Sequence, residues 1–161
     1  MKETNAFIEM VVKINKKVNS FNSYLNPAYK VPILETDFNN TSFYTDLVNI
    51  KWKDQHWPNA EDAGVYFIFG KNCITVEPGV YIGKASFDSA IGYRVWTWLA
   101  KDKEEGNYTM NDKDGKMYKL EYITTISTTT LKAPFLAPSL EEYLRTNLKN
   151  EILLLNSTGN K

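Results

Sequence analysis

The sequence has very few thiol and imidazole side chains, with one cysteine, Cys73, and one histidine, His56, in 161 residues. A single cysteine excludes an internal disulfide framework, and it also excludes a zinc site built from several thiolates. This cysteine content is typical of a reduced, intracellular compartment, so we expect a cytoplasmic protein. For His56 we favour an ordinary loop residue over a catalytic one, because it lies in the turn-forming stretch before Pro58.

Long apolar runs and net charge are also missing. No segment approaches the roughly 18 uncharged apolar residues of a membrane-spanning helix, and Glu9 and Lys13 interrupt the apolar residues near the start as no signal peptide would allow. We therefore expect no contact with a membrane.

Lys plus Arg and Asp plus Glu both number 19, so the formal charge is zero. Such a chain cannot attract a polyanion from a distance, and any nucleic-acid contact must lie in a local charged cleft.

The chain is rich instead in apolar residues, at 43%, and in aromatic residues, at 14%, which is enough for one core and one domain. Residues 5–21 have apolar side chains at helical spacing and predict an amphipathic helix. We interpret its lysines (Lys13, Lys16 and Lys17) as a solvated face in preference to a DNA-contacting arm. Residues 22–60 show no lasting period and predict irregular structure with a short helix near 43–50. Residues 1–58 are thus expected to be a helical extension packed on a domain of residues 59–161.

Two short apolar runs at 64–69 and 80–83 predict a β-hairpin, because turn-forming residues at 70–72 and 78–79 lie between them. The hairpin register is not fixed by these residues, so whether Tyr66 and Tyr81 share a side stays open. A helical period predicts a helix over about 87–101. Residues 104–116 predict a polar connection with a hairpin turn at 112–115, which we favour over a calcium loop because the downstream glutamate is absent.

Residues 117–127 predict a third strand, with Leu120, Tyr122 and Thr124 on one side. The expected fold is therefore α/β, with a small, three-stranded, largely antiparallel sheet flanked by helices.

The last predicted helix contains an inward-facing carboxylate. Residues 139–142, Ser-Leu-Glu-Glu, match a capping box, which predicts that the helix begins at Ser139 and gives Glu142 a structural role. On a helical wheel Glu141 falls instead in the apolar sector, among leucines such as Leu144 and Leu148. A carboxylate that faces the protein body must be paired, hydrogen-bonded or bound to a cation. Glu141 is therefore a candidate metal ligand.

Two tripeptides, Gly64-Val65-Tyr66 and Tyr81-Ile82-Gly83, place a tyrosine and a glycine at the facing ends of the predicted hairpin strands. Glycine permits close approach of another group, so the pair indicates a crowded site. Four further polar residues follow in a fixed order: Lys84, Arg94, Glu141 and Asn156. This ordered set resembles the GIY-YIG nuclease family over about residues 60–160.

The resemblance implies a metal-dependent endonuclease. Hydrolysis of a phosphodiester needs an activated water, relief of charge on the phosphate and help for the departing oxygen. The resemblance assigns Tyr66 as general base, Glu141 as the ligand of a single Mg²⁺ or Mn²⁺, and Arg94 as the contact to the scissile phosphate. It places Tyr81 and Lys84 in the same pocket.

For Asn156 it favours a structural role, and for Gly64 and Gly83 it implies support of the site. One departure concerns the residue one turn after Arg94, where many relatives carry a histidine and this chain has Trp98. A tyrosine base needs roughly 4 kcal/mol of phenolate stabilisation to lower its pKa from about 10 to about 7, so we expect Lys84 or Lys71 to support Tyr66.

Three aromatic residues of the same predicted helix (Tyr93, Trp96 and Trp98) could stack on bases, but we favour core or rim positions for them. Our leading expectation is an endonuclease that acts on DNA, similar to the compact restriction-type members of the family. Cutting both strands would need two protomers, as in a homodimer on DNA, or successive binding events, and the sequence leaves these two alternatives open. The alternative is a non-catalytic module that keeps the fold and binds nucleic acid or protein.

Overall fold

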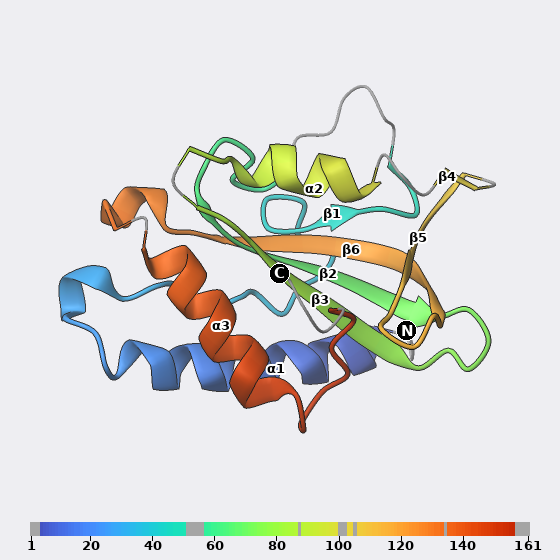
Figure 1. The fold of residues 1–161 in the computed structure, drawn as a ribbon, viewed down its shortest axis with the longest axis horizontal. Helices are drawn as coiled ribbons and strands as arrows, with labels where there is room; N and C mark the ends of the chain where they lie inside the picture. Colours follow the sequence, from blue (N-terminus) through green and yellow to red (C-terminus); the bar gives the residue numbers. More distant parts are fainter. Residues whose placement is uncertain are drawn as a thin grey trace.

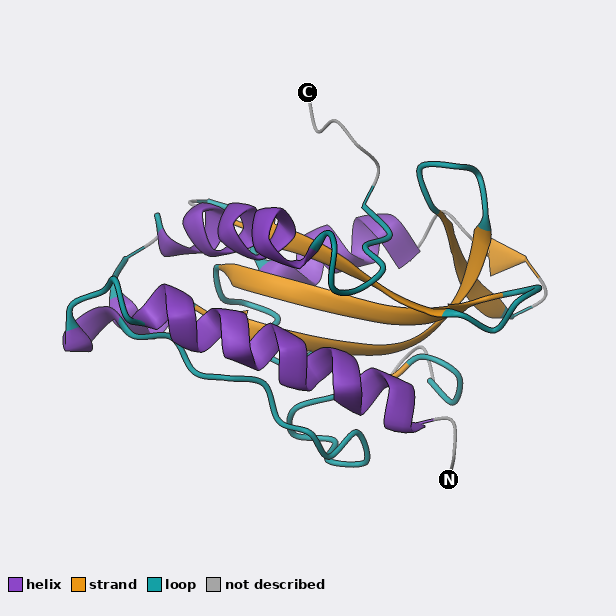
Figure 2. Ribbon diagram, turned by 90° about the horizontal axis from the view of Figure 1, so that it is seen from below, coloured by secondary structure: helices purple, strands orange, loops and turns teal. Residues whose placement is uncertain are grey.

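The computed structural model describes residues 4–50, 57–86, 88–99, 103–104, 106–133 and 135–156. These residues form an α/β fold in which helices cover both faces of an antiparallel sheet (Figure 1). Helix α1 (Thr4–Asn22) and helix α3 (Leu136–Leu148) pack on one face, and helix α2 (Ile91–Leu99) packs on the other. The predicted helix at 5–21 is confirmed, and Figure 2 shows it running along the sheet.

The predicted hairpin is also confirmed, with strands longer than expected. Strand β2 (Gly64–Asn72) is buried along its whole length, because it pairs antiparallel with β3 (Pro78–Ala85) on one edge and with β6 (Met117–Ser127) on the other. A strand buried on both faces reads as a nearly continuous apolar run, as β2 does. Strand β2 is thus enclosed in the sheet, and β3 lies beside it at the edge.

The sheet is larger than the predicted three strands. Among the described residues its strands follow the order β3-β2-β6-β5-β4, and β1 (Thr45–Asp46) pairs with β6 besides. Strand β5 (Asn107–Asn111) and the second residue of β4 (Lys103–Glu104) lie in the stretch that we predicted to be a polar connection. That prediction was wrong because burial of Tyr108 and Met110 is enough to hold this polar stretch as a strand.

The turn at 112–115 is confirmed. The Asp112 side chain accepts hydrogen bonds from the backbone N–H groups of Asp114, at 2.8 Å, and Lys116, at 2.9 Å. Gly115 adopts a positive φ of 76°, which glycine allows without steric strain. The aspartate therefore closes the β5–β6 turn and has no need of a calcium ion to do so.

The short helix predicted near 43–50 is wrong. Thr45 and Asp46 pair with Ile123 and Tyr122 of β6 as strand β1. The Asp46 side chain then accepts hydrogen bonds from the backbone N–H groups of Val48, at 2.8 Å, and Asn49, at 3.2 Å. An aspartate that captures local backbone donors in this way favours a turn over a helix.

Leu120 does not share a side with Tyr122, contrary to our prediction. The pairing of β2 with β6 shifts between Phe69, opposite Tyr122, and Gly70, opposite Leu120, so Glu121 is an extra residue in a β-bulge. A bulge of one residue reverses the alternation of side chains that follow it. Leu120 therefore packs in the core beneath α2, and Tyr122 packs against Phe7 of α1.

Helix α3 begins at Leu136, three residues before the predicted start at Ser139. The Ser139 hydroxyl donates a hydrogen bond of 2.9 Å to the carbonyl of Phe135, so it does not cap the helix, and the predicted capping box is wrong. Pro138 falls in the first turn, where no backbone N–H is required. The earlier start leaves the inward direction of Glu141 unchanged.

The apolar side of α1 belongs to the same core as β2, β3 and α3. Phe7, Val11 and Ile14 are fully buried in it, and the Phe7 ring lies 5.6 Å from that of Phe69 on β2. In the described part of the chain, none of the helices combines the length and the apolar character needed to span a membrane.

Candidate functional site

The two motif tyrosines lie side by side on the face of the sheet that α2 covers. Tyr66 is paired with Gly83 and Tyr81 with Ile68, so the two tyrosines project on the same side. Their ring centroids are 6.1 Å apart with an angle of 23° between the ring planes, and their hydroxyl groups are hydrogen-bonded. The register that the sequence left open therefore brings both phenols together.

The motif glycines make this approach possible. A Cβ atom at Gly83 would overlap the Tyr66 ring at Cζ and Oη, and one at Gly64 would overlap the backbone carbonyl of Ile126 on β6. The Tyr66 ring thus lies across the backbone of β3 at Gly83, because only glycine has no Cβ atom to block it. We conclude that Gly83 determines where the Tyr66 hydroxyl is held.

Replacement of Gly83 by alanine is expected to lower the free energy of unfolding by about 1–3 kcal/mol, because the new methyl group meets the Tyr66 ring in a packed core. Urea denaturation would measure this change in two backgrounds, one with Tyr66 and one with Tyr66→Ala. If the ring is the obstacle, most of the destabilisation disappears when the ring is absent. Equal destabilisation in both backgrounds would contradict this explanation of Gly83.

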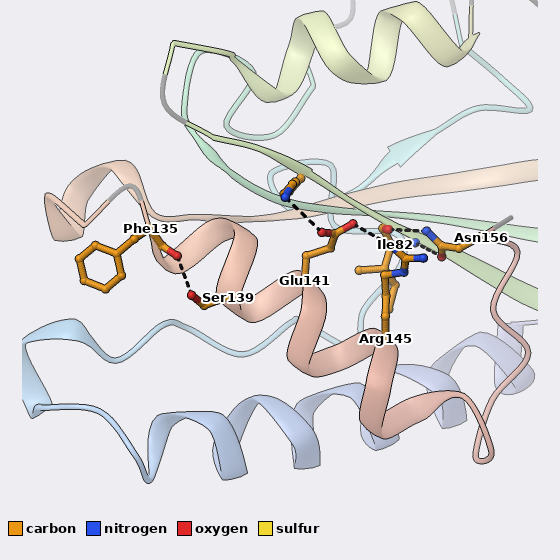
Figure 3. Close-up of polar contacts among 7 residues, drawn as sticks. Ile82, Phe135, Ser139, Glu141, Arg145 and Asn156 are labelled. Atoms are coloured by element: carbon orange, nitrogen blue, oxygen red, sulfur yellow. Dashed lines mark hydrogen bonds and ion pairs between the residues drawn. The ribbon is translucent and has the colours of Figure 1, made fainter. Parts of the chain in front are cut away.

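Glu141 faces the protein body, as the helical wheel predicted. It is only 4% exposed, whereas Glu142 is exposed. Its Oε1 lies 3.4 Å from Nη1 of Arg145, and its Oε2 lies 3.8 Å from Nζ of Lys84 on β3 (Figure 3). The carboxylate of α3 and the lysine that follows the second motif are therefore neighbours in space.

The electrostatics of Tyr81 place further charges around the same point. Burial raises the pKa of Tyr81 above its usual value, and the charge of Glu141 raises it too. The hydrogen bond with Tyr66 opposes this rise, as do the positive charges of Arg145 and of Arg94 on α2. Coulombic effects of this kind fall off with distance, so Glu141, Arg145 and Arg94 lie close enough to influence the protonation of Tyr81.

Asn156 is a structural clamp on β3. Its side-chain oxygen accepts a 3.0 Å hydrogen bond from the backbone N–H of Ile82, and its amide donates one of 2.7 Å to the Ile82 carbonyl (Figure 3). The preceding residues also bind this strand, since Val80 exchanges backbone hydrogen bonds with Leu153 and Leu155. Asn156 thus fixes the backbone between Tyr81 and Gly83.

Lys71 lies far from this group of residues, contrary to one of our two expectations for the support of Tyr66. Its Nζ is 3.5 Å from Oε2 of Glu121 and 5.2 Å from the centroid of the Phe7 ring, on the face that α1 covers. Lys71 and Tyr66 therefore lie on opposite faces of β2. Lys84 also projects from the face opposite the tyrosines, since it pairs with Val65, but it directly follows Gly83, against which the Tyr66 ring lies.

Two aromatic residues of α2, Tyr93 and Trp96, are not core residues. Tyr93 is 70% exposed and Trp96 is 42% exposed. Neither His56 nor the side chain of Trp98 is among the residues that the structure describes. Sequence analysis missed Arg145, although its position four residues after Glu141 is the spacing at which a glutamate and an arginine meet on a helix.

The donor chemistry at Glu141 fits a single hard cation. Within the described ranges, no three His, Cys, Asp or Glu side chains form a group that could enclose a metal. Mg²⁺, however, commonly binds through one or two carboxylates and completes its shell with water and phosphate oxygens. The contacts of Glu141 with Arg145 and Lys84 are longer than the about 2.7–2.9 Å of a tight charged hydrogen bond, so its oxygens can still accept a cation.

Compared with protein-family models, curated proteins and solved structures, the chain matches none of them. The geometry of its own residues therefore carries the functional argument. Two stacked phenols on the α2 side of the sheet, and a buried carboxylate with Lys84 and Arg145 on the α3 side, lie around edge strand β3, and Arg94 of α2 is within electrostatic reach of Tyr81.

Proposed function

We propose that the protein is a metal-dependent endonuclease that hydrolyses phosphodiester bonds of DNA. The observation that carries this proposal is that Tyr66, Tyr81, Lys84 and Glu141 gather around edge strand β3, with the tyrosines on the α2 side and Lys84 and Glu141 on the α3 side. Glu141 and Arg94 both lie within electrostatic reach of Tyr81. These residues occur in the order that the GIY-YIG nucleases use. These residues are far apart in the sequence, and the packing of the fold does not by itself require them to lie together.

In this proposal Tyr66 takes the proton from the attacking water. The positive charge of Lys84, which directly follows the Gly83 that the Tyr66 ring contacts, would favour the phenolate that a base requires. Tyr81 has the opposite role: because burial and Glu141 raise its pKa, it keeps its proton at neutral pH and donates a hydrogen bond. The pair therefore provides one base and one donor to the phosphate.

The charged residues would bind the phosphate and the cation. Arg94 projects from the solvent side of α2, where its planar guanidinium can donate two parallel hydrogen bonds to phosphate oxygens. Glu141 would hold one Mg²⁺ or Mn²⁺, which when bound relieves charge on the phosphate and on the departing oxygen. Since each chain has one such site, cutting both strands requires two protomers on the DNA or two successive events.

Long DNA of high sequence diversity is expected to be cut by the protein only when Mg²⁺ or Mn²⁺ is added. Arg94→Ala should lower the cleavage rate by about 100-fold, which is roughly 3 kcal/mol of transition-state stabilisation. Thr97→Ala is the matched control, because Thr97 is exposed on the same helix. Gel electrophoresis of the products measures both rates. DNA that stays intact under both metals would contradict the proposal.

A second candidate is a non-catalytic module that keeps this arrangement and binds nucleic acid or a protein. The observation in its favour is that Lys84 and Arg145 already compensate the charge of Glu141 without a metal. In that case the three residues form an ion-pair network that joins α3 to β3. Metal uptake that depends on Glu141 separates the two candidates.

A further inference from the structure

A groove of about 460 Å³ begins next to the site and runs along the end of α3. Its polar lining comes from α3 and the segment after it (Glu142, Arg145, Lys149 and Asn156) and from Lys113 in the β5–β6 turn. Arg145 belongs to both places, since it lines the groove and contacts Glu141 (Figure 3). The groove therefore adjoins the proposed active site at Arg145.

The groove concentrates positive charge in a chain that has no net charge. Its lining contains three cationic side chains and one carboxylate, whereas the whole sequence has equal numbers of basic and acidic residues. Thr146 and Asn150 add polar groups that can donate hydrogen bonds. A polyanion that cannot be attracted by the molecule as a whole would be bound at a local excess of this kind.

The helix alone does not explain this charge. Arg145 and Lys149 lie in and just after the last turn of α3, where the helix dipole stabilises cations. Lys113, however, comes from a turn between two strands and gains nothing from that dipole. Cationic side chains from two separate elements, the end of α3 and the β5–β6 turn, thus line the same groove.

We propose that this groove binds backbone phosphates of DNA. These phosphates belong to the same strand as the phosphate that is cut at Glu141, and they lie next to it. The inference rests on the proposed function and adds to it the path of the strand, from Arg94 past Glu141 and Arg145 to Lys113 and Lys149. Phosphate contacts of this type position the strand without selecting its sequence. The groove residues therefore set affinity and register, and the tyrosines and Glu141 act on the bond.

The double variant Lys113→Gln, Lys149→Gln tests the groove. A fluorescein-labelled DNA duplex, in buffer with EDTA, reports binding by fluorescence anisotropy between about 50 and 200 mM KCl. Each lost phosphate contact lowers the slope of log affinity against log salt by about 0.9, so we expect a slope shallower by about 2 and an affinity about tenfold lower at the low salt concentration. Both lysines are exposed, so the fold should persist.

The matched control is Lys16→Gln, Lys30→Gln, which removes the same charge from exposed lysines outside the groove. We expect its affinity to stay within about twofold of the wild type, since distant surface charges are largely screened. An equal loss in both double variants, or an unchanged slope in the groove variant, would overturn the inference.

Binding without metal also separates this inference from the proposed reaction. A protein that binds DNA through the groove and never cuts it would support the groove and refute the nuclease. A protein that cuts DNA and binds it equally well without Lys113 and Lys149 would refute the groove alone.

Discussion

Replacing Glu141 by glutamine is expected to abolish the proposed Mg²⁺-dependent cleavage, with a rate at least about 10³-fold below that of the wild type. Glutamine keeps the size of the side chain but has no negative charge with which to hold a divalent cation. A factor of 10³ corresponds to roughly 4 kcal/mol, within the several kcal/mol that metal catalysis supplies. Cleavage of DNA under saturating Mg²⁺ gives the rate.

The same substitution should leave the fold intact. Removing one partner of a fully buried ion pair destabilises a protein by about 3–5 kcal/mol, because the other charge stays in the interior. Here the partners reach solvent, since the side chains of Lys84 and Arg145 are 37% and 22% exposed. We therefore expect a smaller loss of stability, and urea denaturation of the variant should still show one cooperative transition.

Calorimetric titration with Mn²⁺ gives the decisive comparison. Wild-type protein should take up one cation, Glu141→Gln should take up none, and Glu142→Gln should behave as the wild type because Glu142 is exposed on the outer side of the same helix. If wild-type protein takes up no Mn²⁺, the result would favour the non-catalytic module. Uptake that persists in Glu141→Gln would show that Glu141 is not the ligand.

The features that sequence analysis predicted correctly depend on local chemistry. Glycine, proline and asparagine between two apolar runs predicted the β2–β3 hairpin, and the helical period predicted α1. The inward direction of Glu141 followed from its position relative to Leu144 and Leu148, and it survived an error of three residues in the start of α3. A periodic pattern predicts which face of a helix a side chain occupies more reliably than it predicts the residue at which the helix begins or ends.

The errors concern pairing between distant segments. The predicted side of Leu120 was wrong because of the bulge at Glu121. This bulge depends on how β6 pairs with β2, and the residues next to Glu121 do not predict it. Strand β5 was missed because only Tyr108 and Met110 are buried in it. Tertiary pairing overrides weak local preferences in such stretches.

The position of Lys71 shows how one boundary decides a functional hypothesis. We expected the first strand of the hairpin to end at residue 69, which left Lys71 in a turn and able to approach Tyr66. Strand β2 continues to Asn72, and residues five apart in one strand project to opposite faces. The position of Tyr81 depended on the register of the hairpin, which the residues of its turn did not determine.

Loss of the Tyr66 hydroxyl alone, in Tyr66→Phe, is expected to lower the rate of DNA cleavage by about 10²–10⁴-fold, the usual contribution of a general base. Phenylalanine keeps the ring that packs over Gly83, so the change removes chemistry and little packing. The matched variant is Tyr81→Phe, which removes the other hydroxyl of the stacked pair. Both rates are measured at saturating Mg²⁺ across neutral and alkaline pH.

The pH profile assigns the roles of the two tyrosines. A base must lose its proton before it acts, so the wild-type rate should rise about tenfold per pH unit below the pKa of the base. Tyr81→Phe should keep that rise, since burial raises the pKa of Tyr81 above its usual value, as does Glu141, and Tyr81 therefore stays a donor at neutral pH. Tyr66→Phe should lose the rise, and it should also raise the pKa of Tyr81 further by removing a hydrogen bond that lowers it. The reverse pattern, with the rise lost only in Tyr81→Phe, would make Tyr81 the base and Tyr66 the donor.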